Sequence, residues 1–368
     1  MTAPGVIADR DGESGGGTAS TASTGGMGGT GTTGPTDAAR AGEPWVDPAA
    51  PLVFIVNAAA GRHHADDVHQ SIQRALDETG RRGEMRVTPS SELPRAAADA
   101  ARQAALRHGV VVSVGGDGTT NAVAAAAHAA GCAMGLVAQG TFNYVARTHG
   151  LPTDAYEATR TLLRSRPQPV QVATVNEHLF LVNASVGLYP ELLEDREAFK
   201  QRFGRNRVVA FISCVVTLLG RHRQLHLRID SDGSTRRVVT PTLFVGNNRL
   251  QLEQVHLPEA AALDRGRIAG AVLRPVGSLR LLWLLLKGSM SGLADDASVE
   301  HFVFSHMRLR TGRGGRSEGR SLKVAFDGEL LRLRTPLVFA VAPRPLWLLK
   351  PPPPLDASGH ARTGIDPE

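Results

Sequence analysis

One stretch decides the fold of this 368-residue chain: Val110-Val111-Val112-Ser113-Val114-Gly115-Gly116-Asp117-Gly118-Thr119-Thr120-Asn121. Its β-branched first half predicts a buried strand, and its three glycines predict a tight loop. The alanine-rich segment that follows predicts a helix. Such a unit can seat a phosphate, because glycine lets the main chain approach an anion and the first amides of a helix lack partners.

The loop also carries a carboxylate, Asp117, which indicates more than anion binding. A loop built only for phosphate more often carries lysine nearby. Asp117 could hold a cation against the phosphates or accept a proton. Asp-Gly is also an ordinary turn dipeptide, so a purely structural interpretation stays open for this residue taken alone.

Further strand and loop units lie on both sides of this stretch. Strands are expected at 52–56, 85–88 and 135–138, and helices from the loop after Asn57 to about Thr79 and over 92–107. Strands that alternate with helices predict an α/β domain with a mostly parallel, Rossmann-like sheet, which we place at residues 51–169. Its ligand should lie beyond the carboxyl ends of the strands, where the polar loops 57–61, 115–119 and 140–143 converge.

The pattern changes after about residue 169. Short runs, several with alternating apolar and polar residues, predict a second, antiparallel β-rich domain over residues 170–350. Its expected strands are 179–182, 225–229, 242–245, 307–309, 322–326 and 337–341. Two apolar runs, 208–219 and 281–286, are shorter than the roughly 20 residues that cross a bilayer. Each could be a core helix, or an apolar lip that contacts a membrane or accepts an acyl chain.

Composition bounds the remaining possibilities. Residues 1–50 are rich in Gly, Ser and Thr, and residues 351–368 begin with a proline run, so both are expected to be disordered tails. The formal charge of +6 favours anionic partners. The two cysteines lie far apart in apolar surroundings, which argues against a disulfide framework or a zinc site and fits a cytoplasmic location.

Five segments, in this order, resemble the catalytic-domain family of the diacylglycerol kinases, which includes bacterial lipid kinases and sphingosine kinases. They are the 57–61 loop, the Gly-Gly-Asp-Gly-Thr loop with Asn121, the loop from Gly140 to Asn143 with Val145-Ala146-Arg147, the segment 183–187 and the turn Asp327-Gly328-Glu329. The resemblance covers roughly residues 52–350. It implies a nucleotide-binding α/β domain followed by a β-sandwich, and transfer of the γ-phosphate of ATP, with Mg²⁺, to the hydroxyl of a lipid such as diacylglycerol.

The resemblance also implies roles for single residues. The nucleotide would be bound by Asn57, Gly61, Thr88, Gly115, Gly116, Asp117, Gly118, Thr119, Asn121, Gly140, Thr141 and Asn143. Glu329 is the favoured catalytic base, with Asp327 as competitor or supporting acid and Asp117 as the acid of the glycine loop. A carboxylate near the attacking hydroxyl is what phosphoryl transfer needs.

The chain departs from the family pattern at several positions. Tyr144 stands where the Gly-Thr loop often ends in Asp, and Gln171 stands where an acid is usual. The structural magnesium site of several members would fall at Asp264, but Arg265 occupies the place of the next liganding aspartate and could supply its charge instead of a metal. These departures weaken the case for a structural ion at Asp264.

Two other functions remain open on the sequence alone. One is an NAD kinase, which shares the Gly-Gly-Asp-Gly motif and phosphorylates a ribose hydroxyl; the other is a nucleotide- or lipid-binding regulator with weakened catalysis. For the favoured lipid kinase we expect a lipid alcohol as substrate, peripheral contact with the inner membrane surface and no nucleic-acid partner. The identity of the lipid and the oligomeric state are left open.

Overall fold

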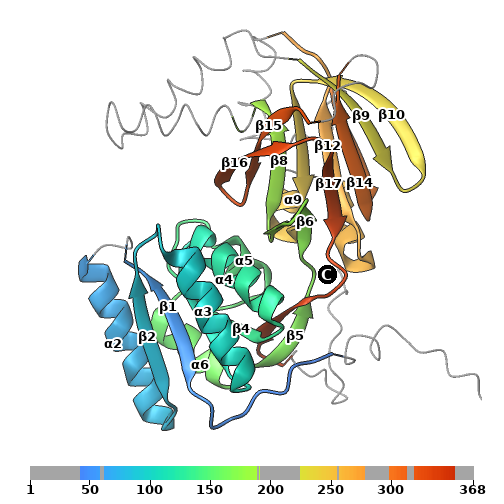
Figure 1. Ribbon diagram of the computed structural model, residues 1–368. Coiled ribbons are helices and arrows are strands. Elements are labelled where there is room, and N and C mark those ends of the chain that lie inside the picture. Colours follow the sequence, from blue (N-terminus) through green and yellow to red (C-terminus); the bar gives the residue numbers. More distant parts are fainter. Residues whose placement is uncertain are drawn as a thin grey trace, which may run out of the picture. The chain divides into compact units, whose positions relative to one another are not determined.

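The protein is represented by a computed structural model, which describes residues 42–58, 62–188, 190, 224–254, 257–277, 298–312 and 319–352. The described chain forms three sheets of six strands each, with helices packed on the first (Figure 1). The predicted fold class, a mostly parallel α/β domain followed by an antiparallel β-domain, is confirmed. Gly61 and the two apolar runs at 208–219 and 281–286 lie outside the described residues.

The first sheet has the strand order β2-β1-β3-β4-β18-β5. Its strands are β1 (Leu52–Asn57), β2 (Gly83–Thr88), β3 (Val110–Gly115), β4 (Ala133–Ala138), β5 (Arg166–Val170) and β18 (Leu346–Lys350). The pairs among β2, β1, β3, β4 and β18 are parallel, and β5 alone pairs antiparallel, with β18. The strands that precede the predicted loops, β1, β3 and β4, are therefore neighbours, and their carboxyl ends lie at one edge of the sheet.

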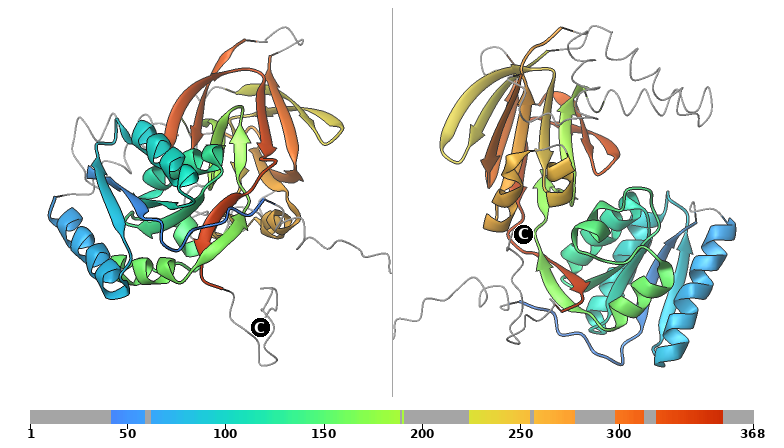
Figure 2. Two further views of the ribbon diagram at one scale, coloured as in Figure 1. Left: turned by 60° about the horizontal axis from the view of Figure 1, so that its bottom comes forward. Right: turned by 180° about the vertical axis from the view of Figure 1, so that it is seen from behind.

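Helices cover both faces of this sheet (Figures 1 and 2). They are α2 (Arg62–Thr79), α3 (Leu93–Leu106), α4 (Asp117–Ala130), α5 (Tyr144–Thr148) and α6 (Ala155–Leu163). Val111 belongs to a core with α3 and α4, whereas Val110 and Val112 belong to a core with α2 and α6. Successive side chains of a strand point to opposite faces, so an unbroken valine run suits a strand that is buried on both.

The other two sheets form a sandwich. One has the order β10-β9-β14-β17-β6-β7 and the other β13-β12-β11-β8-β15-β16. Their bounds are β6 (Ala173–Val175), β7 (His178–Phe180), β8 (Asn183–Gly187), β9 (Leu225–Ser231), β10 (Ser234–Thr240), β11 (Thr242–Gly246), β12 (Ile268–Leu273), β13 (Val299–Phe304), β14 (His306–Thr311), β15 (Ser321–Phe326), β16 (Glu329–Arg334) and β17 (Leu337–Val341). One core lies between these two sheets. Phe180 and Phe339 come from the sheet that begins with β10, and Phe304 and Phe326 come from the sheet that begins with β13. Helix α9 (Arg249–Gln254) and the 3₁₀ helix η2 (Pro258–Arg265) pack on a smaller separate cluster.

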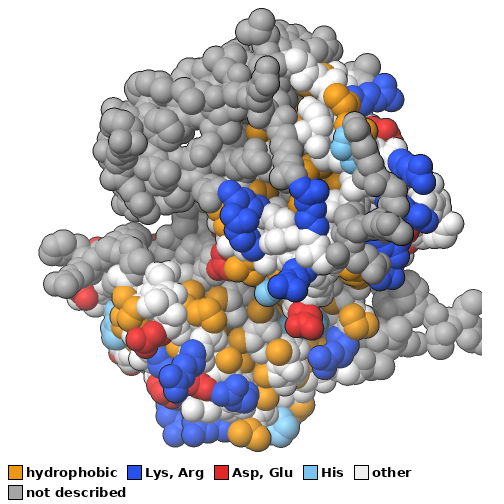
Figure 3. Space-filling view, turned by 45° about the horizontal axis from the view of Figure 1, so that its top comes forward, with side chains coloured by type: hydrophobic (Ala, Val, Ile, Leu, Met, Phe, Trp, Pro, Cys, Tyr) orange, Lys and Arg blue, Asp and Glu red, His pale blue; other side chains and the backbone are white. Residues whose placement is uncertain are grey.

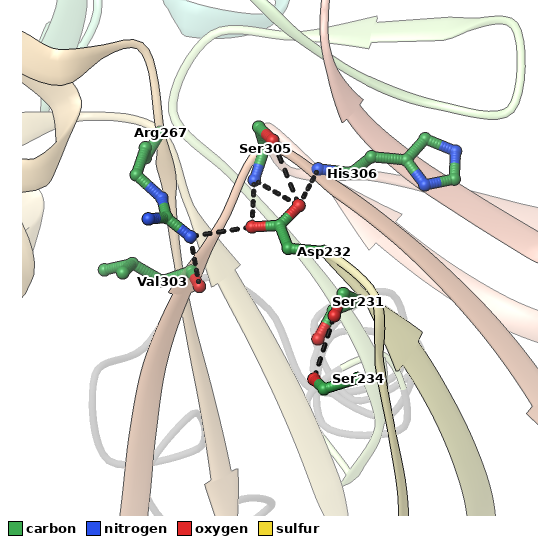
Figure 4. Close-up of polar contacts among 7 residues, drawn as sticks. All are labelled: Ser231, Asp232, Ser234, Arg267, Val303, Ser305 and His306. Atoms are coloured by element: carbon green, nitrogen blue, oxygen red, sulfur yellow. Dashed lines mark hydrogen bonds and ion pairs between the residues drawn. The ribbon is translucent and has the colours of Figure 1, made fainter.

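A cluster of hydrogen bonds around Asp232 joins strands at one end of the sandwich (Figure 4). Asp232, in the turn between β9 and β10, adopts the left-handed conformation that Asp tolerates better than most residues. Its carboxylate accepts hydrogen bonds from the backbone N–H and hydroxyl of Ser305, from the N–H of His306 and from Arg267. Although partial burial acts in the opposite direction, these donors hold the pKa of Asp232 below its usual value. The turn therefore connects three strand ends through one ionised group.

Two sequence-based boundaries differ from the structure. The predicted tail reached residue 50, but residues 42–50 lie against the first domain: the ring of Trp45 meets that of His108 at 5.0 Å, and Asp47 N–H donates to the His108 carbonyl oxygen. Residues 346–350 were included in the predicted second domain, but they form strand β18 of the first sheet, where Leu348 is fully buried. The exact domain limits stay a prediction. No helix among the described residues is both long and apolar enough to span a membrane.

Candidate active site

Two glycine loops meet at the carboxyl ends of β3 and β4. Gly116 lies just before α4, and Gly140 follows β4. A Cβ atom on Gly140 would lie 2.7 Å from the Cα of Gly116, a distance that real Cβ atoms do not reach, so the two backbones touch only because both residues are glycine. A Cβ on Gly118 would meet nothing within 4 Å, so the first turn of α4 is open to a ligand. Exposed amides at this helix start fit a phosphate group.

Asp117 holds the second loop against the first. Its Oδ2 accepts from the N–H of Asn143 at 3.1 Å, and its Oδ1 accepts from the N–H of Tyr144 at 3.0 Å. Both donors are at the start of α5, so the carboxylate caps that helix from another element. Burial raises the pKa of Asp117, and these two N–H groups oppose the increase. Asp117 therefore already has a structural partner for each oxygen.

The Gly140 loop is closed on itself by one asparagine. Asn143 has φ +51°, in the left-handed region that asparagine tolerates, and its side chain bonds Gly140 twice. Its Oδ1 accepts from the Gly140 N–H at 2.8 Å, and its Nδ2 donates to the Gly140 carbonyl oxygen at 2.9 Å. Thr141 is exposed at the loop tip, and the rings of Phe142 and Tyr144 stack at 5.7 Å beside it. Tyr144, one of the departures from the family pattern, is thus part of the loop's own packing.

The end of β1 is tied to the start of α4. Asn57 donates from Nδ2 to Thr119 Oγ1 at 3.1 Å and accepts on Oδ1 from the Ser90 hydroxyl at 3.0 Å. Asn121 is buried in α4, and among the described residues its Oδ1 has no hydrogen-bond partner. The structure thus brings Asn57, Thr119 and Asn121 to one region.

Thr88 also lies at a strand end on this side of the sheet, opposite Asn57 in the β1–β2 register. It is only 5% exposed, and its hydroxyl makes one long contact, 3.4 Å, to the Arg86 carbonyl oxygen. Its expected nucleotide contact stays a prediction.

Asp327 anchors the acidic turn between β15 and β16. Its carboxylate accepts from three successive backbone N–H groups, those of Leu181 at 2.6 Å and of Val182 and Asn183 at 2.9 Å each. Burial raises the pKa of Asp327 to about 6; the three N–H groups oppose the increase, and the negative charge of Asp117 adds to it. The expected strand 179–182 ends at Phe180 in the structure, because the next amides bond this carboxylate instead of a neighbouring strand.

The anchored turn lies close to the glycine loop. Leu181 and Val182 share a hydrophobic core with Val123 and Ala124 of α4, the helix that begins at Asp117. The negative charge of Asp117 also contributes to the raised pKa of Asp327. That the acidic turn and the glycine loop form one site stays a prediction.

Glu329 begins β16, and its side chain is partly exposed. Partial burial raises the pKa of its carboxyl, and the charge of His178 acts to lower it. The His178 ring lies 5.6 Å from that of Phe326, whose backbone pairs with Glu329 across the hairpin. Sequence reasoning missed His178, because no motif marks it and its neighbour in space is about 150 residues away along the chain.

The expected metal position is held by an ion pair. Asp264 Oδ2 accepts from Arg249 Nη1 at 2.9 Å, and Arg249 Nε donates to Glu253 at 2.8 Å. The sequence had suggested Arg265 as the cation beside Asp264, but the structure pairs Asp264 with Arg249. No group of three or more His, Cys, Asp or Glu side chains with metal-binding geometry occurs in the described ranges. The surroundings of Asp264 do not fit a structural magnesium ion.

Gln171, the other departure from the family pattern, joins segments that are distant in sequence. Its Nε2 donates to Asn247 Oδ1 at 2.8 Å and to the Arg267 carbonyl oxygen at 3.0 Å. A carboxylate could not donate either bond. The amide at this position therefore has a structural reason of its own.

Comparison with known proteins gives a consistent result. Residues 51–175 match the family model "Diacylglycerol kinase catalytic domain". An uncharacterized protein of Synechocystis is 33% identical over 66% of this chain and 54% of its own length. A "Probable lipid kinase YegS-like" protein of Serratia proteamaculans is 31% identical over 38% of this chain and 46% of its own length, so the chain spans about half of each of these two relatives. A solved structure of a diacylglycerol kinase from Bacillus anthracis has a similar fold. It is 16% identical in sequence, the match covers 84% of this chain and 98% of the solved chain, and the TM-score is 0.57.

Proposed function

Because residues 51–175 match the family model of the diacylglycerol kinase catalytic domain, we propose that the chain is an ATP-dependent lipid kinase that phosphorylates the hydroxyl of a lipid alcohol such as diacylglycerol. One observation carries the proposal. The acidic turn that ends in Glu329 is fastened by Asp327 to a segment that packs on α4, the helix whose start forms the glycine loop. This attachment supports the proposal that a carboxylate and a phosphate seat act together.

In this proposal the glycine loops bind the triphosphate of ATP. The open space at Gly118, beside the first amides of α4, would accommodate phosphate oxygens, and the close approach of Gly116 leaves no room for a side chain at residue 140. Asp117 keeps the Gly140 loop in position through its two N–H bonds. Mg²⁺ carried by the nucleotide would spread the charge of the transferring phosphoryl group.

Glu329 acts as the base. Its carboxylate takes the proton of the lipid hydroxyl, the hydroxyl oxygen bonds to the γ-phosphorus, and ADP leaves. Asp327 is less suited to this step, because its oxygens already accept three N–H groups, so we assign it the positioning of the turn. A raised pKa brings Glu329 closer to the pH at which it must accept a proton, which is how general bases are tuned.

The proposal is tested by phosphate transfer from radiolabelled ATP with Mg²⁺ to mixed micelles that contain diacylglycerol, a sphingoid base or phosphatidylglycerol, with NAD as a separate acceptor. We expect labelled lipid, and we expect Glu329→Gln to lower kcat by about 10²- to 10⁴-fold with little change in the KM for ATP. Glu177→Gln, an exposed glutamate in the adjoining β6–β7 turn, is the matched control and should keep full activity.

Other outcomes would assign the chain elsewhere. Label in NAD alone would replace the lipid by a ribose hydroxyl as acceptor. ATP binding without transfer to any acceptor would leave a nucleotide-binding regulator. Full activity of Glu329→Gln would remove Glu329 from the mechanism and return Asp327 to consideration.

A further inference from the structure

A cavity of about 290 Å³ lies between helix α5, the residues that precede α9 and the segment that leaves β5. The described residues that line it include none that we assign to the nucleotide or to the catalytic base. Its volume is at the lower end of the range of ligand pockets, so it suits a small molecule. Polar side chains on its lining are Thr148, His149, Gln171, Asn247, Asn248 and Arg249.

Asn248 offers this cavity an amide NH₂ group without a partner. The residue is only 4% exposed, and its Oδ1 accepts from the Thr148 hydroxyl at 3.0 Å and from the Gln251 N–H at 3.1 Å. Because a backbone N–H can only donate, the oxygen must lie on that side of the amide. The nitrogen makes no hydrogen bond to a described residue. A nearly buried donor left unpaired costs stability, and a bound acceptor removes that cost.

His149 is the second group on the lining whose side chain has no hydrogen-bond partner among the described residues. Burial, together with the positive charge of Lys350, lowers the pKa of His149 to about 4. The ring is therefore neutral at neutral pH and presents one N–H donor. Lys350 is itself partly buried, which lowers its pKa, and it forms no ion pair with any described residue. A positive charge beside His149 thus lacks a carboxylate to balance it.

The acid on the described lining, Asp264, is already paired, because Arg249 Nη1 donates to its Oδ2 at 2.9 Å. Gln171 Nε2 and Asn247 Oδ1 likewise bond each other at 2.8 Å. On the face drawn in Figure 3, Lys and Arg side chains are scattered among acidic and hydrophobic ones, so surface charge alone selects no position for an anion. The cavity, in contrast, combines unpaired donors with a nearby cation, which favours a negatively charged hydrogen-bond acceptor.

We propose that this cavity binds a small oxyanion, either free phosphate or the phosphate group of a small phosphate monoester. The N–H groups of Asn248 and His149 donate to its oxygens, and the charge of Lys350 balances its own. Because His149 follows α5 and Asn248 precedes α9, a bound anion joins these two helices. The site is distinct from the glycine loops, and its occupancy does not depend on the proposed kinase activity.

The test follows the histidine Cε1–H signals of the full chain by NMR at constant pH and ionic strength, with His149→Leu to assign the signal of His149. Phosphate and glycerol phosphate should each shift this signal until it saturates, and glycerol should not. Asn248→Asp keeps the oxygen that Thr148 and Gln251 bond but replaces the donor by a negative oxygen. It should weaken binding about 10- to 100-fold, because a hydrogen bond to a charged acceptor is lost. Equilibrium dialysis with radiolabelled phosphate should show a loss for His149→Leu as well, a variant that breaks no hydrogen bond among the described residues.

The matched control is Asn176→Asp in the β6–β7 turn, which adds the same charge and keeps the oxygen that accepts from the Val338 N–H at 2.8 Å. It should bind like the wild type, and an equal loss in this control would overturn the proposal. A His149 signal that ignores both oxyanions, or that responds equally to glycerol, would do the same. Gly118→Ala, which narrows the proposed phosphate seat at α4, should leave the His149 response unchanged. If it abolishes that response, the signal reports the glycine loops and the separate site falls, whereas the proposed nucleotide site stands.

Discussion

At the scale of single residues, the environment of Glu329 makes a prediction about pH. Burial raises its pKa and the charge of His178 counteracts that increase. A base works only when deprotonated, so activity should rise with pH through the pKa of Glu329. His178→Gln removes the opposing charge, so the acid limb of the kcat profile should move to higher pH, with the plateau at high pH little changed.

The measurement is kcat against pH for both proteins at saturating ATP and lipid. His226→Gln, a histidine on β9, is the control and should keep the wild-type profile. A His178→Gln profile that superimposes on the wild type would show that His178 does not act on the base.

A substitution at Gly118 should affect stability and the proposed nucleotide binding in opposite directions. A Cβ at this position meets no protein atom within 4 Å, and the residue lies in the first turn of α4. Replacing a helical glycine by alanine gains up to about 1 kcal/mol of stability. The same methyl group would occupy the space that we assign to a phosphate, so Gly118→Ala should melt at the same or higher temperature and bind ATP more weakly.

Calorimetric titration with an ATP analogue, beside thermal melting, decides this case. The comparison is Gly140→Ala, in which the new Cβ would strike the Gly116 backbone, so that both stability and nucleotide binding should fall. Unaltered affinity in Gly118→Ala would place the phosphates elsewhere.

At the scale of elements, Asp117 and Asp154 cap different helices. Asp117 bonds the first amides of α5 from another loop, whereas Asp154 accepts from the N–H of Glu157 within its own helix start, α6. Asp117→Asn replaces one of two accepting oxygens by an NH₂ group that cannot accept, and should cost about 1–3 kcal/mol. Asparagine caps a helix about as well as aspartate, so Asp154→Asn should cost less than about 0.5 kcal/mol. Because α5 begins in the glycine-loop site, Asp117→Asn should also raise the KM for ATP several-fold, and Asp154→Asn should not.

Denaturant unfolding and steady-state kinetics measure the two effects on the same proteins. Equal KM values in both variants would make Asp117 a plain helix cap. A loss of kcat without any loss of stability would instead indicate that Asp117 contacts the reacting groups, which is the role that the sequence had suggested.

The same scale shows what could be predicted from sequence. The runs at β1 and β3 are short, apolar and rich in β-branched residues, which favours a buried strand over a helix, and each ends in glycine or asparagine, so the strand-loop-helix units were predictable. Strand β5 was not, since its segment Arg166–Val170 contains two prolines; it is tolerated because β5 is an edge strand. The effect of the His178 charge on Glu329 was also beyond sequence reasoning, because it depends on how two sheets meet.

At the scale of the whole molecule, the chain returns to its first domain at the end. Strand β18 follows the last strand of the sandwich but is inserted between β4 and β5, and residue periodicity alone cannot reveal this, because a short apolar run fits either sheet. The sheet of the α/β domain is therefore complete only when residues 346–350 are in place. The sandwich is consequently an insertion within the α/β domain, attached through both β5 and β18.

This topology predicts that a residue of β18 stabilises the α/β domain. Leu348 is fully buried and belongs to the core that contains α3 and α4. Leu348→Ala should lower the free energy of unfolding by about 2–4 kcal/mol and weaken ATP binding at elevated temperature. Leu106→Ala, the same substitution at a site that is 84% exposed, should change stability by less than about 0.5 kcal/mol. Urea unfolding with and without an ATP analogue distinguishes them, and a Leu348→Ala protein as stable as Leu106→Ala would mean that β18 does not belong to the first sheet.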